Sequence, residues 1–263
     1  MAAPHPAYGV LRPVTATASV LLAENPSPMT LEGTNTWVLR APDATGCVVV
    51  DPGPDDEAHL RRVLACGPVA EVLLTHGHPD HAEGARRFAE LAGGVPVRAL
   101  DPALRLGSEG LAGGDVVHAA GLDVRVLATP GHTADSLSFL VTDDGGAAVL
   151  TGDTVLGRGT TVVAHPDGRL ADYLDSLHGL ADLAPGTVVL PGHGPELPDA
   201  GEVARAYLAH REQRLEQVRA ALADLGPDAT ARQVVEVVYA DVDRAVWPAA
   251  ELSVRAQIEY LRP

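Results

Sequence analysis

Short apolar runs alternate with polar helical stretches through the first 190 residues of the chain. The runs predict strands at 37–39, 47–50, 72–74, 95–98, 122–127, 137–141, 147–150 and 188–190. Periodic apolar positions predict helices at about 55–65, 79–91 and 171–183. Strands with helices between them are typical of an α/β fold, in which helices flank a layered sandwich of sheets.

After Pro198 the pattern changes to long helical segments. Helices are predicted at about 201–225, 230–240 and 248–261, with a turn at 226–228 that contains Gly and Pro. We therefore divide the chain into a large domain at 1–199 and a small helical domain at 200–263.

Composition indicates a globular protein and limits the classes of partner that it can bind. With 263 residues, of which 46% are hydrophobic, the chain can bury a sizeable core. Its formal charge of −16 would repel a polyanion over most of the surface, so no broad nucleic-acid-binding surface is expected. Cys47 and Cys66 are the only cysteines, which excludes a disulfide framework and a cysteine-based zinc site.

Nothing in the sequence indicates a membrane protein. The amino-terminal stretch lacks the basic segment and apolar core of a secretory signal. No apolar run reaches the roughly 18 residues that a membrane helix needs. We therefore expect a cytoplasmic protein without membrane contact.

The segment His76-Gly77-His78-Pro79-Asp80-His81 follows an apolar run and opens a predicted helix. Turns at the ends of strands are where α/β folds build their sites. In an extended backbone, alternate residues such as His76 and His78 point the same way, while Asp80 and His81 begin the helix and can face a neighbouring point. This spacing of imidazole and carboxylate groups is typical of a metal site.

Three later segments repeat this placement. His132, Asp153 and His193 each follow a strand-like run and are flanked by Gly, Pro or Thr turn residues. Five His and two Asp exceed the ligand set of one catalytic zinc but suit two metals that share a bridging carboxylate. Nitrogen and oxygen donors without thiolate suit zinc, manganese or iron, and the predominance of imidazole favours zinc.

These motifs together resemble the metallo-β-lactamase superfamily, and the resemblance spans nearly the whole chain. It implies a four-layer αβ/βα sandwich with the metals at one edge. It also implies that His76, His78 and His132 hold a first metal, that Asp80, His81 and His193 hold a second, and that Asp153 bridges them.

Two segments, 25–36 and 152–162, resemble the lactamase-beta-two-like branch of that superfamily. The run His210-Arg211-Glu212-Gln213-Arg214 and the helical end are similar to the winged-helix-like carboxyl-terminal domain of that branch. The resemblance implies a hydrolase, since animal members cleave single-stranded RNA and bacterial members are mostly known only as hydrolases.

A hydroxide that bridges two metals is the expected nucleophile, because both charges lower the pKa of water. Asp80 is the expected catalytic residue, since it binds a metal and could accept the proton of the nucleophile. Asp51 is either a partner that orients a ligating His or a turn residue before Pro52. Thr34, Asn35 and Thr161 are candidate substrate-binding residues on the rim.

Other charged and polar residues carry weaker signals. Arg158 and Arg169 could meet an anionic substrate. The remaining histidines lack matching motifs and are expected at the surface or in helix packing: His5, His59, His118, His165, His178 and His210.

Several functions stay open. The first is an endoribonuclease that acts on single-stranded RNA, and the second is a thioesterase or lactonase that acts on small acyl substrates. A third, of another class, is a persulfide dioxygenase with one iron at His76, His132 and Asp153. A fourth is a binding module in which the helical end reads DNA, although that end shows no strong basic face. A homodimer is compatible with the sequence.

Overall fold

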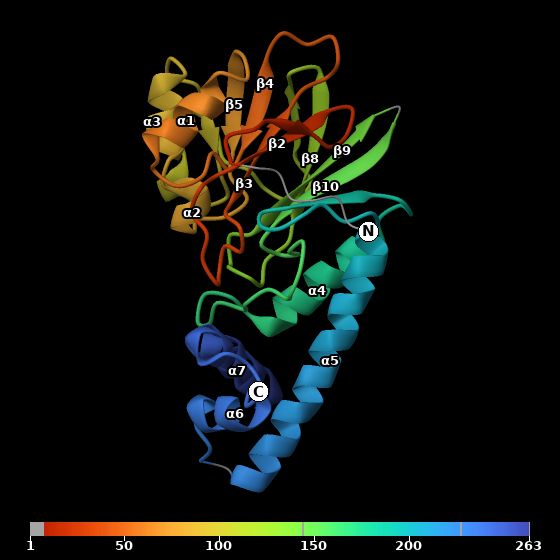
Figure 1. Ribbon diagram of the computed structural model, residues 1–263. Helices are drawn as coiled ribbons and strands as arrows, with labels where there is room; N and C mark the ends of the chain where they lie inside the picture. Colours follow the sequence, from red (N-terminus) through yellow and green to blue (C-terminus); the bar gives the residue numbers. More distant parts are fainter. Residues whose placement is uncertain (1–7, 144, 227, 263) are drawn as a thin grey trace.

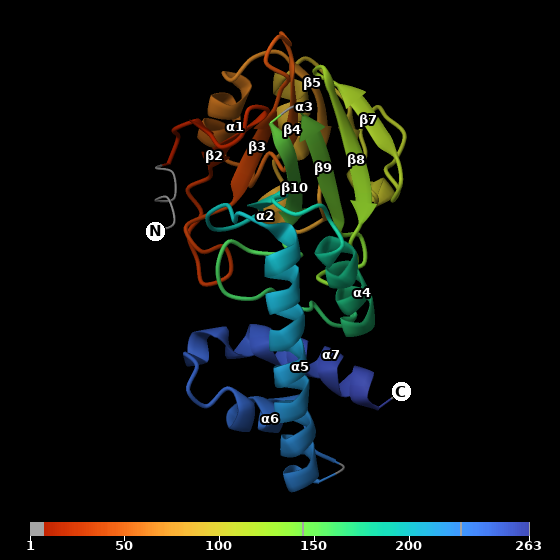
Figure 2. The same cartoon turned by 90° about the vertical axis from the view of Figure 1, so that its right-hand side faces the viewer.

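The computed structural model describes residues 8–143, 145–226 and 228–262 (Figure 1). The amino-terminal stretch with His5 therefore lies outside the described residues, as do residue 144 and residue 227 of the predicted turn at 226–228. Two sheets, with helices on their outer faces, form the larger part of the molecule, and a group of helices lies below one edge of the sheets (Figures 1 and 2).

The first sheet has the strand order β1-β2-β3-β4-β5-β6. Strands β1 to β4 pair antiparallel, whereas β4, β5 and β6 pair parallel. Their bounds are β1 Arg12–Pro13, β2 Ala18–Leu22, β3 Asn35–Leu39, β4 Cys47–Val50, β5 Val69–Leu73 and β6 Val97–Arg98. The predicted strands in this half are confirmed, and β1 and β2 are additional strands that the pattern did not predict.

The second sheet has the order β11-β10-β9-β8-β7, in which only β10 and β11 pair parallel. Its bounds are β7 Val116–Ala119, β8 Leu122–Ala128, β9 Leu137–Asp143, β10 Gly146–Gly152 and β11 Val188–Pro191. All predicted strands of this half are present, and β7 adds an edge strand.

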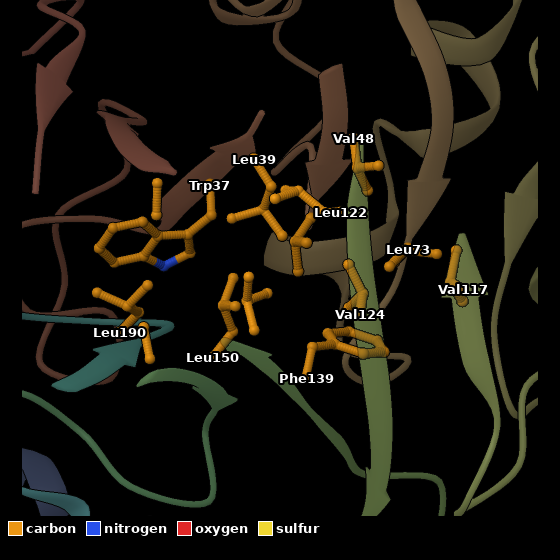
Figure 3. Close-up of a cluster of buried hydrophobic side chains, with 14 of the residues drawn as sticks. Trp37, Leu39, Val48, Leu73, Val117, Leu122, Val124, Phe139, Leu150 and Leu190 are labelled. Atoms are coloured by element: carbon orange, nitrogen blue, oxygen red, sulfur yellow. The ribbon is translucent and has the colours of Figure 1, made fainter. Parts of the chain in front are cut away.

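The main core lies between the two sheets (Figure 3). Trp37, Val48 and Leu73 of the first sheet pack there against Phe139 and Leu150 of the second. Strand β4 is buried along its whole length, because alternate side chains face this core and a second core on the outer side.

Helices cover both outer faces. Helices α1 (Glu57–Leu64) and α3 (Ala85–Leu91) pack on the first sheet, and α4 (Leu170–Ala181) and α5 (Ala200–Leu225) pack on the second. The order helix, sheet, sheet, helix confirms the four-layer αβ/βα sandwich.

The single helix predicted at 79–91 is wrong in one respect, because it is divided into α2 (Pro79–Ala82) and α3. The division falls at Gly84, whose N–H donates to the carbonyl of Gly53 at 3.0 Å and not to a carbonyl within the helix. A side chain at this position would meet the carbonyl oxygen of Pro54 at 2.7 Å. The close approach of the 53–54 loop therefore redirects the backbone just beyond Asp80 and His81.

The carboxyl-terminal region consists of helices, as predicted. Beyond the long α5 come α6 (Ala231–Val238), a short 3₁₀ helix at Arg244–Val246 and α7 (Trp247–Leu261). Another short 3₁₀ helix, at Pro102–Leu104, lies between β6 and β7. Val218 of α5, Val234 and Val235 of α6, and Trp247 and Val254 of α7 form a separate small core. Among the described residues, no helix is long and apolar enough to cross a bilayer.

Candidate metal centre

All seven predicted metal ligands lie at one edge of the sandwich. His76 follows β5, His132 follows β8, Asp153 follows β10 and His193 follows β11. Parallel strands end at the same edge of a sheet, which brings the residues after β10 and β11 together. The remaining three lie in the turn and first residues of α2: His78 at the N-cap, then Asp80 and His81.

The first group of donor atoms contains His76, His78, His132 and Asp153. The Nδ1 atom of His78 lies 3.0 Å from Nε2 of His76 and 3.0 Å from Nε2 of His132. Oδ2 of Asp153 lies 3.6 Å from Nε2 of His132. All four donors lie within 4.8 Å of one another.

The second group contains Asp80, His81 and His193. Oδ2 of Asp80 lies 3.3 Å from Nε2 of His81 and 3.2 Å from Nε2 of His193. Oδ1 of Asp153 lies 3.4 Å from both of these nitrogens and, though buried, has no hydrogen-bond partner among the described residues. Asp153 therefore presents one oxygen to each group.

The outer nitrogen of four imidazoles is held by a hydrogen bond. Nδ1 of His132 donates to the carbonyl of Val162 at 2.6 Å, and Nδ1 of His193 donates to that of Gly33 at 3.0 Å. Nδ1 of His81 donates to the carboxylate of Asp51 at 2.8 Å. A ring nitrogen that donates outward leaves Nε2 with its lone pair directed into the site.

His76 is held in the same way through Thr75. The Thr75 hydroxyl donates to Oδ2 of Asp51 at 2.6 Å, so it accepts from Nδ1 of His76 at 3.0 Å. Two nitrogens of a tetrahedral zinc site lie about 3.3 Å apart, given the usual zinc–nitrogen distance. The converging lone pairs and the unpartnered oxygen of Asp153 therefore fit divalent metal ions.

Ionisation favours the same conclusion in the second group. Burial opposes the charged form of His193, but Asp153 and Asp80 outweigh burial and raise its pKa to about 9. Burial also opposes ionised Asp80, yet the hydrogen bond to His193 and the charge of His81 lower its pKa to about 2. The carboxylates thus stay ionised and require positive charge, which divalent ions would supply while displacing the imidazole protons.

The first group differs, because burial favours the neutral form of two of its imidazoles, those of His76 and His132. Burial, with His81 nearby, lowers the pKa of His76 well below its usual value. Burial also lowers the pKa of His132. A neutral imidazole is the form that coordinates a metal.

Two of the three predicted substrate-binding residues lie behind the candidate ligands. Asn35 is buried and donates from Nδ2 to the carbonyls of Pro191 and Gly194 at 3.0 and 2.8 Å, which holds the loop of His193. The Thr34 hydroxyl is buried and donates to Asp80 at 3.1 Å. Neither side chain faces an open surface, so the structure gives them a supporting position.

Thr161 both supports a candidate ligand and lines a cavity. Its hydroxyl donates to the backbone carbonyl of Asp153, and the residue also lines a cavity beside the metal centre. The same loop is fastened to the carboxyl-terminal helices, because Arg211 donates to the Thr161 carbonyl and the N–H of Val163 donates to Ser253 at 3.2 Å. Helices α5 and α7 thus hold the loop that contacts His132 and Asp153.

The cavity has a volume of about 380 Å³ and lies between the metal centre and the carboxyl-terminal helices. His132 and Asp153 form part of its wall. Its other sides come from loops of the sandwich, from α5, from the segment 239–246 and from α7: Pro28, Met29, Leu31, Leu156, Arg158, Gly159, Thr160, Thr161, Val162, His210, Arg211, Arg214, Tyr239, Val242, Val246, Ala249, Ala250 and Ser253.

The cavity corrects two sequence-based interpretations. His210 lines it and is not simply a surface or helix-packing residue. Arg158 also lines it, whereas Arg169 lies elsewhere, 3.8 Å from Glu259. The motif containing His210 and Arg214 could have indicated this, because residues four apart share one helix face.

The other described histidines fit the expectation. His118 and His178 are exposed, and His165 contacts Glu259 at 2.9 Å. His59 is buried in helix packing, with Nε2 at 2.9 Å from the hydroxyl of Thr36.

The chain belongs to the metallo-beta-lactamase superfamily, which its residues 29–193 match. Residues 230–262 match the beta-lactamase associated winged helix domain. A solved beta-lactamase domain protein from Burkholderia ambifaria is similar, with a TM-score of 0.81, 26% identity and coverage of 98% of this chain and 89% of that one. Among curated proteins, the beta-lactamase-like protein 2 homolog of Caenorhabditis elegans is 32% identical over 92% of this chain and 82% of its own length.

Two fungal proteins are also similar. Lactamase-like protein adaB of Aspergillus niger is 34% identical over 80% of this chain, which spans 65% of that relative's length. The atrochrysone carboxyl ACP thioesterase of Aspergillus fumigatus is 30% identical over 83% of this chain and 72% of its own length. The resemblance to the superfamily and to its beta-lactamase-like protein 2 members is confirmed.

Proposed function

We propose that this protein is a two-metal hydrolase in which His76, His78 and His132 hold one ion, Asp80, His81 and His193 hold the other, and Asp153 bridges them. The observation that carries the proposal is the position of Asp153, whose two oxygens face the two groups. A single-iron dioxygenase would use only His76, His132 and Asp153 and would leave the second group without a role.

Two divalent ions, with zinc favoured, would polarise the scissile bond of the substrate and lower the pKa of a water nucleophile. Asp80 is the better placed of the two site carboxylates to handle a proton, since its side chain is 26% exposed and that of Asp153 only 12%. Thr34 donates to Oδ2 of Asp80 and so orients the carboxylate.

The preferred substrate is a small acyl thioester or ester. Apolar side chains of Met29, Leu31, Leu156, Val162 and Val246 line the cavity, whose volume suits an acyl group and not a length of polynucleotide. The similarity to an ACP thioesterase supports this choice over the lactone. Single-stranded RNA is the second candidate, because Arg158, Arg211 and Arg214 also line the cavity.

The test combines metal quantification of the purified protein with parallel assays on an acyl thioester, a lactone and single-stranded RNA. We expect two metal ions per chain and hydrolysis of the thioester. Asp80→Ala should lower this activity by about 10²- to 10⁴-fold, whereas Asp224→Ala, at an exposed position of α5, should leave it unchanged. One iron per chain, or cleavage of RNA alone, would contradict the proposal.

A further inference from the structure

The cavity beside the metal centre has a charge opposite to that of the chain. The protein has a formal charge of −16, yet three arginines and only one acid line the cavity. That acid is Asp153, which lies in the metal centre. In an acidic protein, a cationic cavity wall attracts an anionic group more strongly than most of the molecular surface does.

Not all three arginines are available to a ligand. Arg158 is paired with Glu32, with a hydrogen bond of 2.7 Å. Arg211 is buried, donates to the Thr161 carbonyl and lies over the ring of Tyr173. These two side chains are therefore occupied by the protein itself.

Arg214 differs, because no carboxylate lies within ion-pair distance of it in the described part of the chain. Its guanidinium lies 4.4 Å from the ring centroid of Tyr239 and donates to Gln217 at 2.8 Å and to the Val238 carbonyl at 3.1 Å. These contacts orient the guanidinium without neutralising its charge.

His210 lies one helical turn before Arg214 on α5 and lines the same cavity. Its Nδ1 atom is buried and has no hydrogen-bond partner among the described residues. A buried polar atom without a partner costs free energy unless a ligand or water satisfies it. His210 and Arg214 thus bring an imidazole with an unpartnered nitrogen and a charge without a carboxylate partner to the wall of one cavity.

Apolar side chains from both parts of the molecule also line the cavity. Met29 of the large domain and Val242 of the carboxyl-terminal region both line the cavity and are 49% and 37% exposed. A ligand that spans the cavity would therefore meet the metal centre, an apolar wall and a cation.

We propose that His210 and Arg214 form an anion subsite, so that the substrate is an apolar acyl thioester or ester carrying a carboxylate or phosphate group. This rests on the proposed hydrolase function and deepens it. The winged-helix region would then help to select the substrate, because Tyr239 orients the arginine.

The test uses calorimetry to measure how tightly the metal-loaded protein binds three thioether compounds. Thioethers are chosen because they cannot be hydrolysed. One ligand is 5-(2-acetamidoethylthio)pentanoate, the second is its phosphonate analogue and the third is its neutral carboxamide. We expect at least one anion to bind about tenfold more tightly than the carboxamide. The stronger of the two identifies the favoured group.

Arg214→Gln should remove this preference, and Arg214→Lys should restore most of it by restoring the charge. His210→Gln should weaken anion binding by a smaller factor. Arg219→Gln is the matched control, because Arg219 lies on the same helix but pairs with Glu216 outside the cavity. Circular dichroism and metal content would verify that each variant is folded and loaded.

Equal binding of anions and carboxamide, or an anion preference that survives Arg214→Gln, would overturn the subsite. An anion preference that depends on Arg214 would support it even in a protein that hydrolyses no thioester. Such a protein would contradict only the proposed function, so the two failures are distinguishable.

Discussion

Asp51 Oδ2 lies 2.8 Å from Nδ1 of His81, and both groups are buried. The same carboxylate accepts from the backbone N–H and the hydroxyl of Thr75 at 2.8 and 2.6 Å. Asp51 also has a positive φ of 51°, which marks it as a turn residue. Both interpretations of this residue from the sequence therefore hold: it forms the turn after β4 and orients imidazoles in both donor groups, His76 through Thr75.

Asp51→Asn should weaken metal binding by about 10- to 100-fold, because it removes the charge that supports His81 while preserving a residue that tolerates positive φ. Competition with a chelator measures the affinity. Asp56→Asn, which alters a helix cap on α1 away from the centre, is the control. Unchanged metal affinity in Asp51→Asn would show that the carboxylate serves the turn alone.

Gly192→Ala should disrupt the metal centre by steric contact. An added Cβ would lie 2.7 Å from Oδ1 of Asp153 and 2.7 Å from Cε1 of His81, closer than atoms approach. We expect loss of at least one metal ion and a fall in activity of about 100-fold or more, since small displacements are costly in such sites. Gly179→Ala in α4, where the new Cβ meets nothing within 4 Å, should instead stabilise the fold by about 0.5–1 kcal/mol. Normal metal content in Gly192→Ala would contradict the geometry.

Arg211→Met should lower kcat by about tenfold or more, because the loop that contacts His132 and Asp153 loses its attachment to α5. Arg205→Met is the matched control. It also removes a hydrogen bond from α5 to a carbonyl, but that carbonyl belongs to Ala181 at the end of α4. Thermal unfolding measures any loss of stability in each variant, so that a loss of stability can be separated from a fall in kcat. If kcat falls equally in both variants, the loop attachment is not what positions the ligands.

His59 should make the stability of the fold depend on pH. Burial lowers its pKa from 6.5 to about 4, to which the charge of Arg62 adds, while Asp56 opposes the shift. The folded state then binds fewer protons than the unfolded state between these values. The contribution of neutral His59 to the stability of the fold is therefore present above pH 6.5 and is lost as the pH falls toward 4.

His59→Gln, which can still hydrogen-bond to Thr36, should reduce the loss of unfolding free energy across this range by up to about 3 kcal/mol. Urea unfolding at a series of pH values measures this difference, with a chelator present so that metal release does not contribute. Parallel pH profiles for the two proteins would exclude His59 as the titrating group.

Much of the fold could be predicted from the sequence, since the burial of β3, β4 and β9 follows directly from their apolar runs. Strand β1 has only two residues and β7 is half exposed, so neither presents a clear pattern. The division of α2 from α3 was also hidden, because it depends on the 53–54 loop, which is distant in sequence. Thr34 and Asn35 were placed near the centre, but their burial behind the ligands depends on contacts with Asp80 and with the loop of His193.

The sequence by itself determined which residues gather at the rim, because ligand type and strand-end position are local properties that survive in a linear pattern. It also indicated a helical carboxyl-terminal region. The tertiary structure alone decided that Asp153 faces both donor groups and that His210 and Arg214 share a cavity with His132 and Asp153. Those relationships join segments up to roughly a hundred residues apart, and only the packing of the two sheets against each other and of α5 on the second sheet brings such segments within a few ångströms.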